Sequence, residues 1–142
     1  MPSIARTRDG YRIEVSREVD ATPEAAWQLL VTPEQWPAWG PSVRAVDCDD
    51  DRIEAGTSGK VRLPGGVWLP FEVVTCEAPG ENRPGRWSWR VARIPATGHR
   101  VEAVATDCAR VVFEIPPAAA GYAPVCSRAL DRIESVLTGE QG

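Results

Sequence analysis

Residues from Val43 to Ile115 alternate between apolar and polar side chains, and short turn sequences interrupt the alternation. This pattern predicts strands at residues 43–49, 57–63, 67–77, 86–94, 99–106 and 109–115. The segment Leu63-Pro64-Gly65-Gly66-Val67 is typical of a turn, and Thr106-Asp107-Cys108-Ala109 is typical of a tight connection. Strands joined by such short connections pair side by side in opposite directions, so we expect an antiparallel sheet.

A further strand is expected before this region. Tyr11, Ile13, Val15 and Val19 share one face of an alternating pattern, as in a half-buried strand. Arg17 interrupts the apolar face, and it marks either the exposed end of the strand or a charge turned inward. Residues 1–10 carry charges without a period, which predicts a frayed tail or the approach to the strand.

Two short helices are expected to follow, because Thr22-Pro23-Glu24 recurs as Thr32-Pro33-Glu34. In each copy Thr suits the N-cap, Pro the first helical position and Glu the positive end of the helix dipole. The first helix should run from Pro23 to about Val31. Pro37 and Gly40-Pro41 should end the second within about a turn and a half, with Trp36 and Trp39 on one side of it.

The last helix is predicted from about Ala123 to Leu137, because apolar residues recur there at intervals of three and four. Gly139 should end it, and residues 139–142 should form a second frayed tail. The order of elements predicts an α+β fold in which a curved, seven-stranded antiparallel sheet wraps around this helix. Where helix and sheet diverge, a cavity is expected to open. The length of 142 residues fits a single domain, residues 1–142.

Composition narrows the classes of partner and site. The net charge is −4 and the sequence contains no basic run, which argues against a nucleic-acid or anionic-membrane binder. No apolar stretch is long enough for a membrane helix and no secretory signal is recognisable, so we expect a cytoplasmic protein without integral membrane association. The cysteines form no CxxC pair and the chain has a single histidine, so we expect no metal site. Without a recognisable export signal we expect no disulfide framework, and because no Walker A or GxGxxG motif occurs we expect no cofactor.

The run VSREVDATPEAAWQLLVTPEQWPAWGPSV, the strands after it and the terminal ALDRIESVL helix resemble the polyketide cyclase/dehydrase branch of the START-like superfamily, which includes the birch-pollen-allergen fold. The strand segment Arg86-Trp87-Ser88-Trp89 contributes to the resemblance, which covers roughly residues 11–138. It implies a helix-grip fold with an internal cavity. Members of this superfamily include lipid carriers, aromatic polyketide cyclases, hormone receptors and co-chaperone domains, so the resemblance does not choose one activity.

The candidate site follows from this fold. Alternation places Trp87, Trp89 and Val91 on one face, which would look into the cavity in the resembling fold, and Trp36 and Trp39 would border its entrance. Simple core packing is the alternative for each of these tryptophans. His99 is the only possible imidazole acid or base, and it is either that or a hydrogen-bonded structural residue. The candidate ligand-binding residues are Trp36, Trp39, Phe71, Trp87, Trp89, Val91, His99, Val101, Tyr122 and Cys126.

These residues suggest three kinds of function. The first is a monomer or weak homodimer that binds or carries a small hydrophobic molecule; six tryptophans against two phenylalanines and two tyrosines favour a ring-bearing ligand. The second is a cyclase- or dehydratase-type lyase or isomerase with His99 as acid/base, helped by Tyr122 or by Arg17 or Arg93 if either points inward. The third is a protein-interaction domain, which needs an exposed apolar patch. No nucleophile elbow, phosphate-binding loop or HExxH motif supports another enzyme class.

Overall fold

A single antiparallel sheet forms the frame of the protein in the computed structural model, which describes residues 3–7 and 10–139. Its eight strands lie in the order β1-β2-β8-β7-β6-β5-β4-β3, so strands close in sequence are neighbours except where β2 pairs with β8. The strands are β1 Ser3–Thr7, β2 Gly10–Val19, β3 Ala45–Asp47, β4 Ser58–Arg62, β5 Trp68–Glu77, β6 Gly85–Val91, β7 Ile94–Ala105 and β8 Cys108–Ile115.

Helices α1 (Pro23–Val31) and α2 (Trp36–Trp39) are separated by the 3-10 turn η1 (Pro33–Gln35), and a second 3-10 turn, η2 (Pro117–Tyr122), leads into the long helix α3 (Ala123–Thr138). Thr22 caps α1, because its Oγ1 accepts a hydrogen bond from the amide of Ala25 at 3.1 Å. Gly139 ends α3 with φ 76°, in the left-handed region that glycine adopts at low cost. No helix in the described part of the chain is long and apolar enough to cross a membrane.

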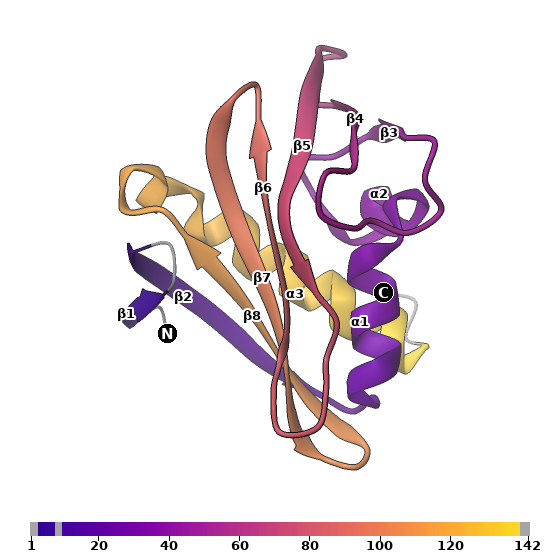
Figure 1. The fold of residues 1–142 in the computed structure, drawn as a ribbon, viewed down its shortest axis with the longest axis vertical. Coiled ribbons are helices and arrows are strands. Elements are labelled where there is room, and N and C mark those ends of the chain that lie inside the picture. Colours follow the sequence, from indigo (N-terminus) through magenta and orange to yellow (C-terminus); the bar gives the residue numbers. More distant parts are fainter. Residues whose placement is uncertain (1–2, 8–9, 140–142) are drawn as a thin grey trace.

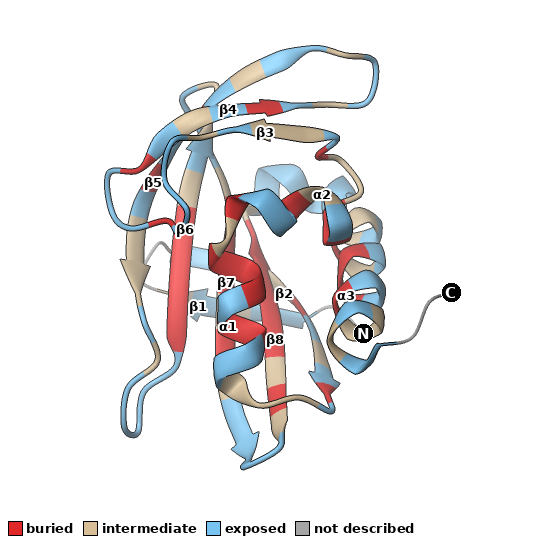
Figure 2. Cartoon of the chain, turned by 90° about the vertical axis from the view of Figure 1, so that its right-hand side faces the viewer, coloured by how far each residue is buried: buried red, intermediate tan, exposed pale blue. Residues whose placement is uncertain are grey.

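The helices cover one face of the curved sheet, and α3 crosses that face (Figure 1). In Figure 2 the buried residues lie mainly where helices and strands face each other. Cys126, Ala129, Leu130 and Ile133 recur at helical spacing and form the buried side of α3. Each large apolar side chain buried in this way contributes about 1.5–3 kcal/mol. The predicted helix-grip arrangement is confirmed.

The number of strands differs from the prediction, because residues 3–7, expected in a tail, form β1 on the edge of the sheet. This strand pairs only with β2 and its side chains are mostly exposed, so its sequence carries no apolar alternation. Of the other residues expected in tails, Gly10 begins β2 and Gly139 caps α3, while 1–2, 8–9 and 140–142 lie outside the described residues.

The β6–β7 hairpin also differs from the prediction. Strand β7 begins at Ile94, five residues before the predicted start at His99. Ala92 and Arg93 form the turn with φ of 52° and 68°, a conformation that usually requires Gly, Asn or Asp. Ala92 and Arg93 carry no turn signal, whereas Pro95 and Gly98 do. The sequence pattern therefore predicted the turn, and with it the start of the strand, too late in the chain.

The face of the sheet opposite the helices contains a buried ion pair. Glu114 in β8 is 1% exposed, and its Oε1 accepts hydrogen bonds from Arg86 Nε at 3.0 Å and Nη2 at 2.6 Å. Its other oxygen accepts one from Arg100 Nη1 at 2.5 Å, and Arg100 also pairs with Glu14 and Glu102. The charges are thus compensated, as burial requires.

Candidate functional site

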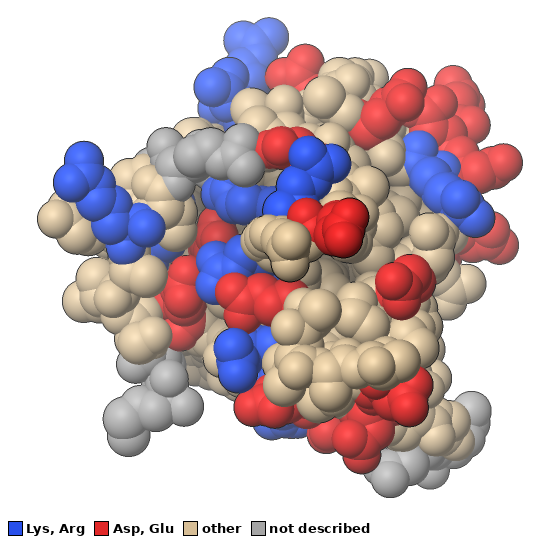
Figure 3. Space-filling view, turned by 60° about the horizontal axis from the view of Figure 1, so that its bottom comes forward, with Lys and Arg blue, Asp and Glu red and all other residues tan. Residues whose placement is uncertain are grey.

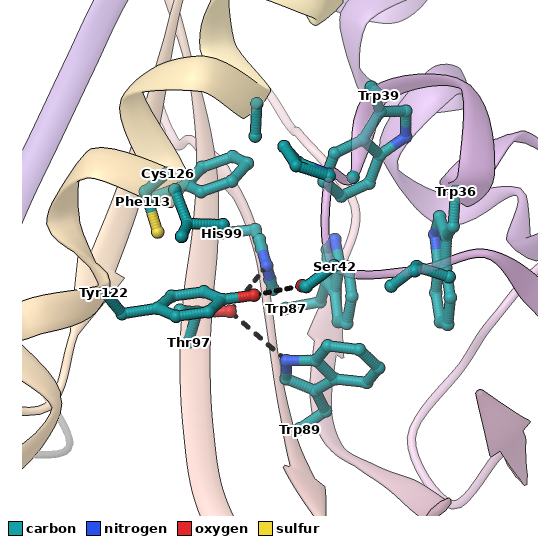
Figure 4. Close-up of a pocket in the computed structure, with 15 residues that line it drawn as sticks. Trp36, Trp39, Ser42, Trp87, Trp89, Thr97, His99, Phe113, Tyr122 and Cys126 are labelled. Atoms are coloured by element: carbon teal, nitrogen blue, oxygen red, sulfur yellow. Dashed lines mark hydrogen bonds between the residues drawn. The ribbon is translucent and has the colours of Figure 1, made fainter. Parts of the chain in front are cut away.

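A small inner chamber lies between the sheet, α2 and the start of α3, with a volume of about 40 Å³ (Figure 4). Its walls are mostly aromatic and apolar. This inner chamber is lined by Trp36, Trp39, Gly40, Pro41, Ser42, Val43, Trp87, Trp89, Thr97, His99, Phe113, Tyr122, Val125, Cys126 and Ala129. It is large enough for a water molecule but too small for a ring system.

Trp36 and Trp39 form the α2 side of this chamber and are 1% and 6% exposed. Their indole N–H groups donate to the carbonyl oxygens of Leu30 at 2.8 Å and Leu29 at 3.3 Å, which ties α2 to the end of α1. The short helix α2 directs both indole rings towards the interior, as their spacing of three residues predicts. Both rings lie deep inside, however, so the expectation that they flank the entrance was wrong.

A stack of three rings forms the floor of the inner chamber. Trp36 lies parallel to Trp87 with ring centroids 5.3 Å apart, and His99 stacks on Trp87 at 3.9 Å. Phe113 meets His99 edge to face at 4.9 Å. Strand pairing explains the arrangement, because Trp87, His99 and Phe113 lie opposite one another on β6, β7 and β8.

His99 is held in its neutral form. The side chain is 2% exposed, and the pKa of His99 is lowered to about 3, mainly by burial. The main chain of Trp87 opposes this shift, and the nearby Arg86 charge acts in the same direction as burial. Its Nε2 shares a hydrogen bond of 2.9 Å with Thr97 Oγ1, which also accepts one from Trp89 Nε1 at 3.2 Å. Among the described residues, His99 Nδ1 and Trp87 Nε1 are the buried side-chain polar atoms without a hydrogen-bond partner.

A larger outer chamber of about 370 Å³ adjoins the inner one. The two chambers share Ser42, Val43, Trp89, Thr97 and Tyr122, and we call this set the boundary. The exposed lining residues are Ile94, Pro95, Ala119 and Tyr122, and Tyr122 is 37% exposed, so the chamber reaches the surface at these residues. The outer chamber is lined by Ser42, Val43, Val61, Leu63, Leu69, Trp89, Val91, Ala92, Ile94, Pro95, Ala96, Thr97, Pro116, Ala119 and Tyr122, all of them uncharged.

At the boundary, the hydroxyl groups of Ser42 and Tyr122 are hydrogen-bonded to each other (Figure 4). The bond joins the loop after α2 to the start of α3. Burial raises the pKa of Tyr122, and the hydrogen bond from Ser42 acts in the opposite direction, so the phenol is protonated at neutral pH. Burial also raises the pKa of the neighbouring Cys126 thiol to about 12, so this residue is an uncharged part of the wall.

Most of the predicted site residues line a chamber, but some do not. Phe71 and Val101 are 3% and 1% exposed and line neither chamber; Phe71 packs edge-on against Trp36. Arg17 faces α3, where it pairs with Asp131 and Glu134, and Arg93 lies in the exposed β6–β7 turn. The inner chamber contains Trp36, Trp39, Trp87, Trp89, His99, Tyr122 and Cys126, and the outer chamber contains Trp89, Val91 and Tyr122.

Thr97 and Ser42 line both chambers but were not among the predicted site residues. Thr97 precedes His99 by two residues and shares its face, a signal that was lost when the strand was started at His99. Ser42 carries no pattern of its own, because its position depends on how the loop after α2 meets Tyr122.

Charged side chains elsewhere do not form a second extended site on the face shown in Figure 3, where acidic and basic groups lie next to each other. Among the residues that the structure describes, no group of three or more His, Cys, Asp or Glu side chains is arranged to hold a metal ion.

An antiparallel sheet that wraps around one long C-terminal helix, with chambers between them, defines a START-like domain. The chain belongs to the family described as polyketide cyclase / dehydrase and lipid transport, which its residues 11–138 match. No curated protein matches the sequence closely enough to count as a relative.

Several solved structures share the fold at low sequence identity. Human StAR-related lipid transfer protein 5 is 11% identical, with a TM-score of 0.68, over 97% of this chain and 81% of that one. The protein XoxI from Bacillus cereus is 15% identical, with a TM-score of 0.65, over 89% of this chain and 95% of that one. Norcoclaurine synthase from Thalictrum flavum, in complex with a transition state analogue, is 12% identical, with a TM-score of 0.53, over 100% and 99%. These similarities concern the fold alone.

Proposed function

We propose that the protein binds or carries a small, ring-bearing apolar molecule in the outer chamber, with one end of the molecule at the boundary. The observation that carries this proposal is an uncharged, mostly apolar chamber of about 370 Å³ that reaches the surface at its rim. Small-molecule sites are typically concave and apolar, with a few polar groups that orient the ligand, and their volumes begin at about 300 Å³.

The two chambers would have different roles. The inner chamber, at about 40 Å³, holds no ring, so the body of the ligand would occupy the outer chamber. There the ligand would meet the ring of Trp89 and the apolar side chains of Val91 and Leu69. Flat apolar surfaces such as indole favour flat ligands. The family description, which includes lipid transport, and the likeness to a lipid transfer protein also support an apolar ligand.

A proton-transfer role for His99 has weaker support. A general base works best when its pKa is near the operating pH, whereas burial lowers the pKa of His99 to about 3. Its Nε2 is already bonded to Thr97, at 2.9 Å. These features favour a residue that fixes Thr97 and Trp89 at the boundary over one that exchanges protons with a substrate.

The proposal can be tested with N-phenyl-1-naphthylamine, an uncharged probe whose fluorescence rises in apolar surroundings. We expect saturable binding to the wild type and its loss in Ala119→Trp, because Ala119 lines the outer chamber and an indole would occupy it. Ala118→Trp is the matched control, since Ala118 is an exposed neighbour in η2 that lines neither chamber.

Binding by the wild type that survives in Ala119→Trp would contradict the proposed site, and absence of any binding would contradict the function. Native mass spectrometry of protein purified from its own host provides a second measurement. A bound small molecule that is retained by Ala118→Trp and lost from Ala119→Trp is the expected result.

A further inference from the structure

The distribution of polar groups around the outer chamber is uneven. Of its lining residues, those with polar side-chain atoms are Ser42, Trp89, Thr97 and Tyr122, and all four belong to the boundary. The remaining lining residues are aliphatic or proline. A ligand in this chamber therefore meets hydrogen-bonding groups at one end only, where three hydroxyls and one indole N–H lie together (Figure 4).

These groups retain some hydrogen-bonding capacity. The bond between Ser42 and Tyr122 uses one of their two hydroxyl protons, so the other proton and unused lone pairs remain for a ligand. Thr97 Oγ1 accepts from Trp89 and shares a further bond with His99, which leaves either its proton or one lone pair unused. The boundary can thus donate about one or two hydrogen bonds and accept about two or more.

Positive charge is missing from the same place. All lining residues of both chambers are uncharged side chains or the neutral His99. The nearby Arg86 lies on the opposite face of the sheet, paired with Glu114. A carboxylate at the boundary would thus be partly desolvated without a counter-charge, whereas a hydroxyl or carbonyl group would find suitable partners.

We infer that the ligand is an uncharged molecule with a hydroxyl or carbonyl group at one end, and that the hydroxyl pair of Ser42 and Tyr122 recognises this group. This inference rests on the proposed function and narrows its ligand class, because it excludes carboxylic acids bound as anions with the acid group at the boundary. Ser42 and Tyr122 are specificity-determining residues: the apolar wall holds the ring system, and the hydroxyl pair selects its substituent.

The test compares naphthalene, 2-naphthol and 2-naphthoate, which share one ring system and differ in the substituent. Affinities are measured at pH 7 by the change in tryptophan fluorescence and confirmed by competition with N-phenyl-1-naphthylamine. One added hydrogen bond should make 2-naphthol bind about fivefold more tightly than naphthalene. Because 2-naphthoate would carry an uncompensated charge, it should bind at least about tenfold more weakly than 2-naphthol.

Substitutions identify the groups responsible. In Ser42→Ala and Tyr122→Phe, and more completely in the double variant, the affinity ratio of 2-naphthol to naphthalene should fall towards one. Ser127→Ala and Tyr11→Phe are matched controls, because these residues line neither chamber, and their ratio should equal that of the wild type. Using a ratio within each variant separates lost recognition from a general loss of binding.

The possible failures are distinct. If neither the probe nor any of the three compounds binds, the proposed function is wrong and this inference falls with it. If 2-naphthoate binds as tightly as 2-naphthol, the chamber accepts anions; the inference is then wrong while the proposed function stands. If the affinity ratio of 2-naphthol to naphthalene is unchanged in the double variant, other groups bind the hydroxyl substituent, and the assignment to Ser42 and Tyr122 is wrong.

Discussion

The imidazole of His99 lies almost flat on the indole of Trp87, with ring centroids 3.9 Å apart and ring planes inclined by 21°. The two residues are direct cross-strand partners in β6 and β7, on the face that carries the chambers. This contact buries a titratable group in an aromatic cluster, where protonation would place a charge away from water. The stability of the fold should therefore depend on the protonation of one residue.

Acidification should destabilise the wild type more than His99→Phe. His99 stays neutral in the folded state until the pH approaches 3, whereas in the unfolded chain it takes up a proton below its ordinary pKa of 6.5. Between these values the unfolded state binds more protons, so the stability falls as the pH falls, by up to about 1.4 kcal/mol per pH unit. Urea unfolding measures this effect. Between pH 7 and pH 5 the free energy of unfolding should fall by about 2 kcal/mol more in the wild type than in His99→Phe. Equal losses in both proteins would show that His99 is not responsible.

Removal of the buried carboxylate Glu114 should strongly destabilise the protein. In Glu114→Ala, the guanidinium of Arg86 loses the partner that accepts two of its hydrogen bonds, so we expect a loss of about 3–5 kcal/mol in urea unfolding. Glu81→Ala, at an exposed loop position, should change the stability by less than about 0.5 kcal/mol. The double variant Arg86→Met/Glu114→Leu should be more stable than Glu114→Ala, because it removes both charges of the buried pair. Arg100 would still pair with Glu14 and Glu102 in this variant. A double variant as unstable as Glu114→Ala would show that the loss of Glu114 as a partner of the Arg86 charge is not the cause.

Gly98 should be required for the same ion pair. A Cβ at this position would lie 2.7 Å from Glu114 Oε1 and 3.3 Å from Arg86 Nη2. The Arg86 side chain can therefore reach across β7 to Glu114 only because residue 98 has no side chain. Gly98→Ala should cost about 1–3 kcal/mol in urea unfolding. Gly121→Ala is the control, since a Cβ there meets nothing within 4 Å. The cost of Gly98→Ala should also shrink in the Glu114→Ala background; an undiminished cost would place the clash elsewhere.

The fold was predictable because its strongest signals are local. Alternation identified the strands that carry Trp87 and His99, and helical spacing identified α3 with its end at Gly139. These patterns depend only on neighbouring residues and on which face of an element is buried. The edge strand β1, which buries little, lacks such a pattern and was missed.

The site was only partly predictable, because its polar groups meet through the tertiary structure. Ser42 and Tyr122 are 80 positions apart, and their contact depends on where the loop after α2 meets the start of α3. Thr97 was missed for a different reason: the turn at Ala92 and Arg93 uses a backbone conformation that these residue types rarely adopt. Arg86 and Glu114 were not recognised as a pair, because their contact depends on strand register and on the space above Gly98.

The two Thr-Pro-Glu sequences look alike but should respond differently to mutation. Thr22 Oγ1 accepts a hydrogen bond from the Ala25 amide, whereas Thr32 makes no such cap and donates its hydroxyl to the Gln28 carbonyl at 2.6 Å. Thr22→Ala should therefore lower the free energy of unfolding by about 1 kcal/mol, and Thr22→Ser should retain most of it. Thr32→Ala should cost less than half as much, because the Gln28 carbonyl keeps access to water at an exposed position. Urea unfolding of the three variants decides the matter: equal costs at Thr22 and Thr32 would mean that the sequence repeat, and not the cap geometry, determines the contribution of each threonine.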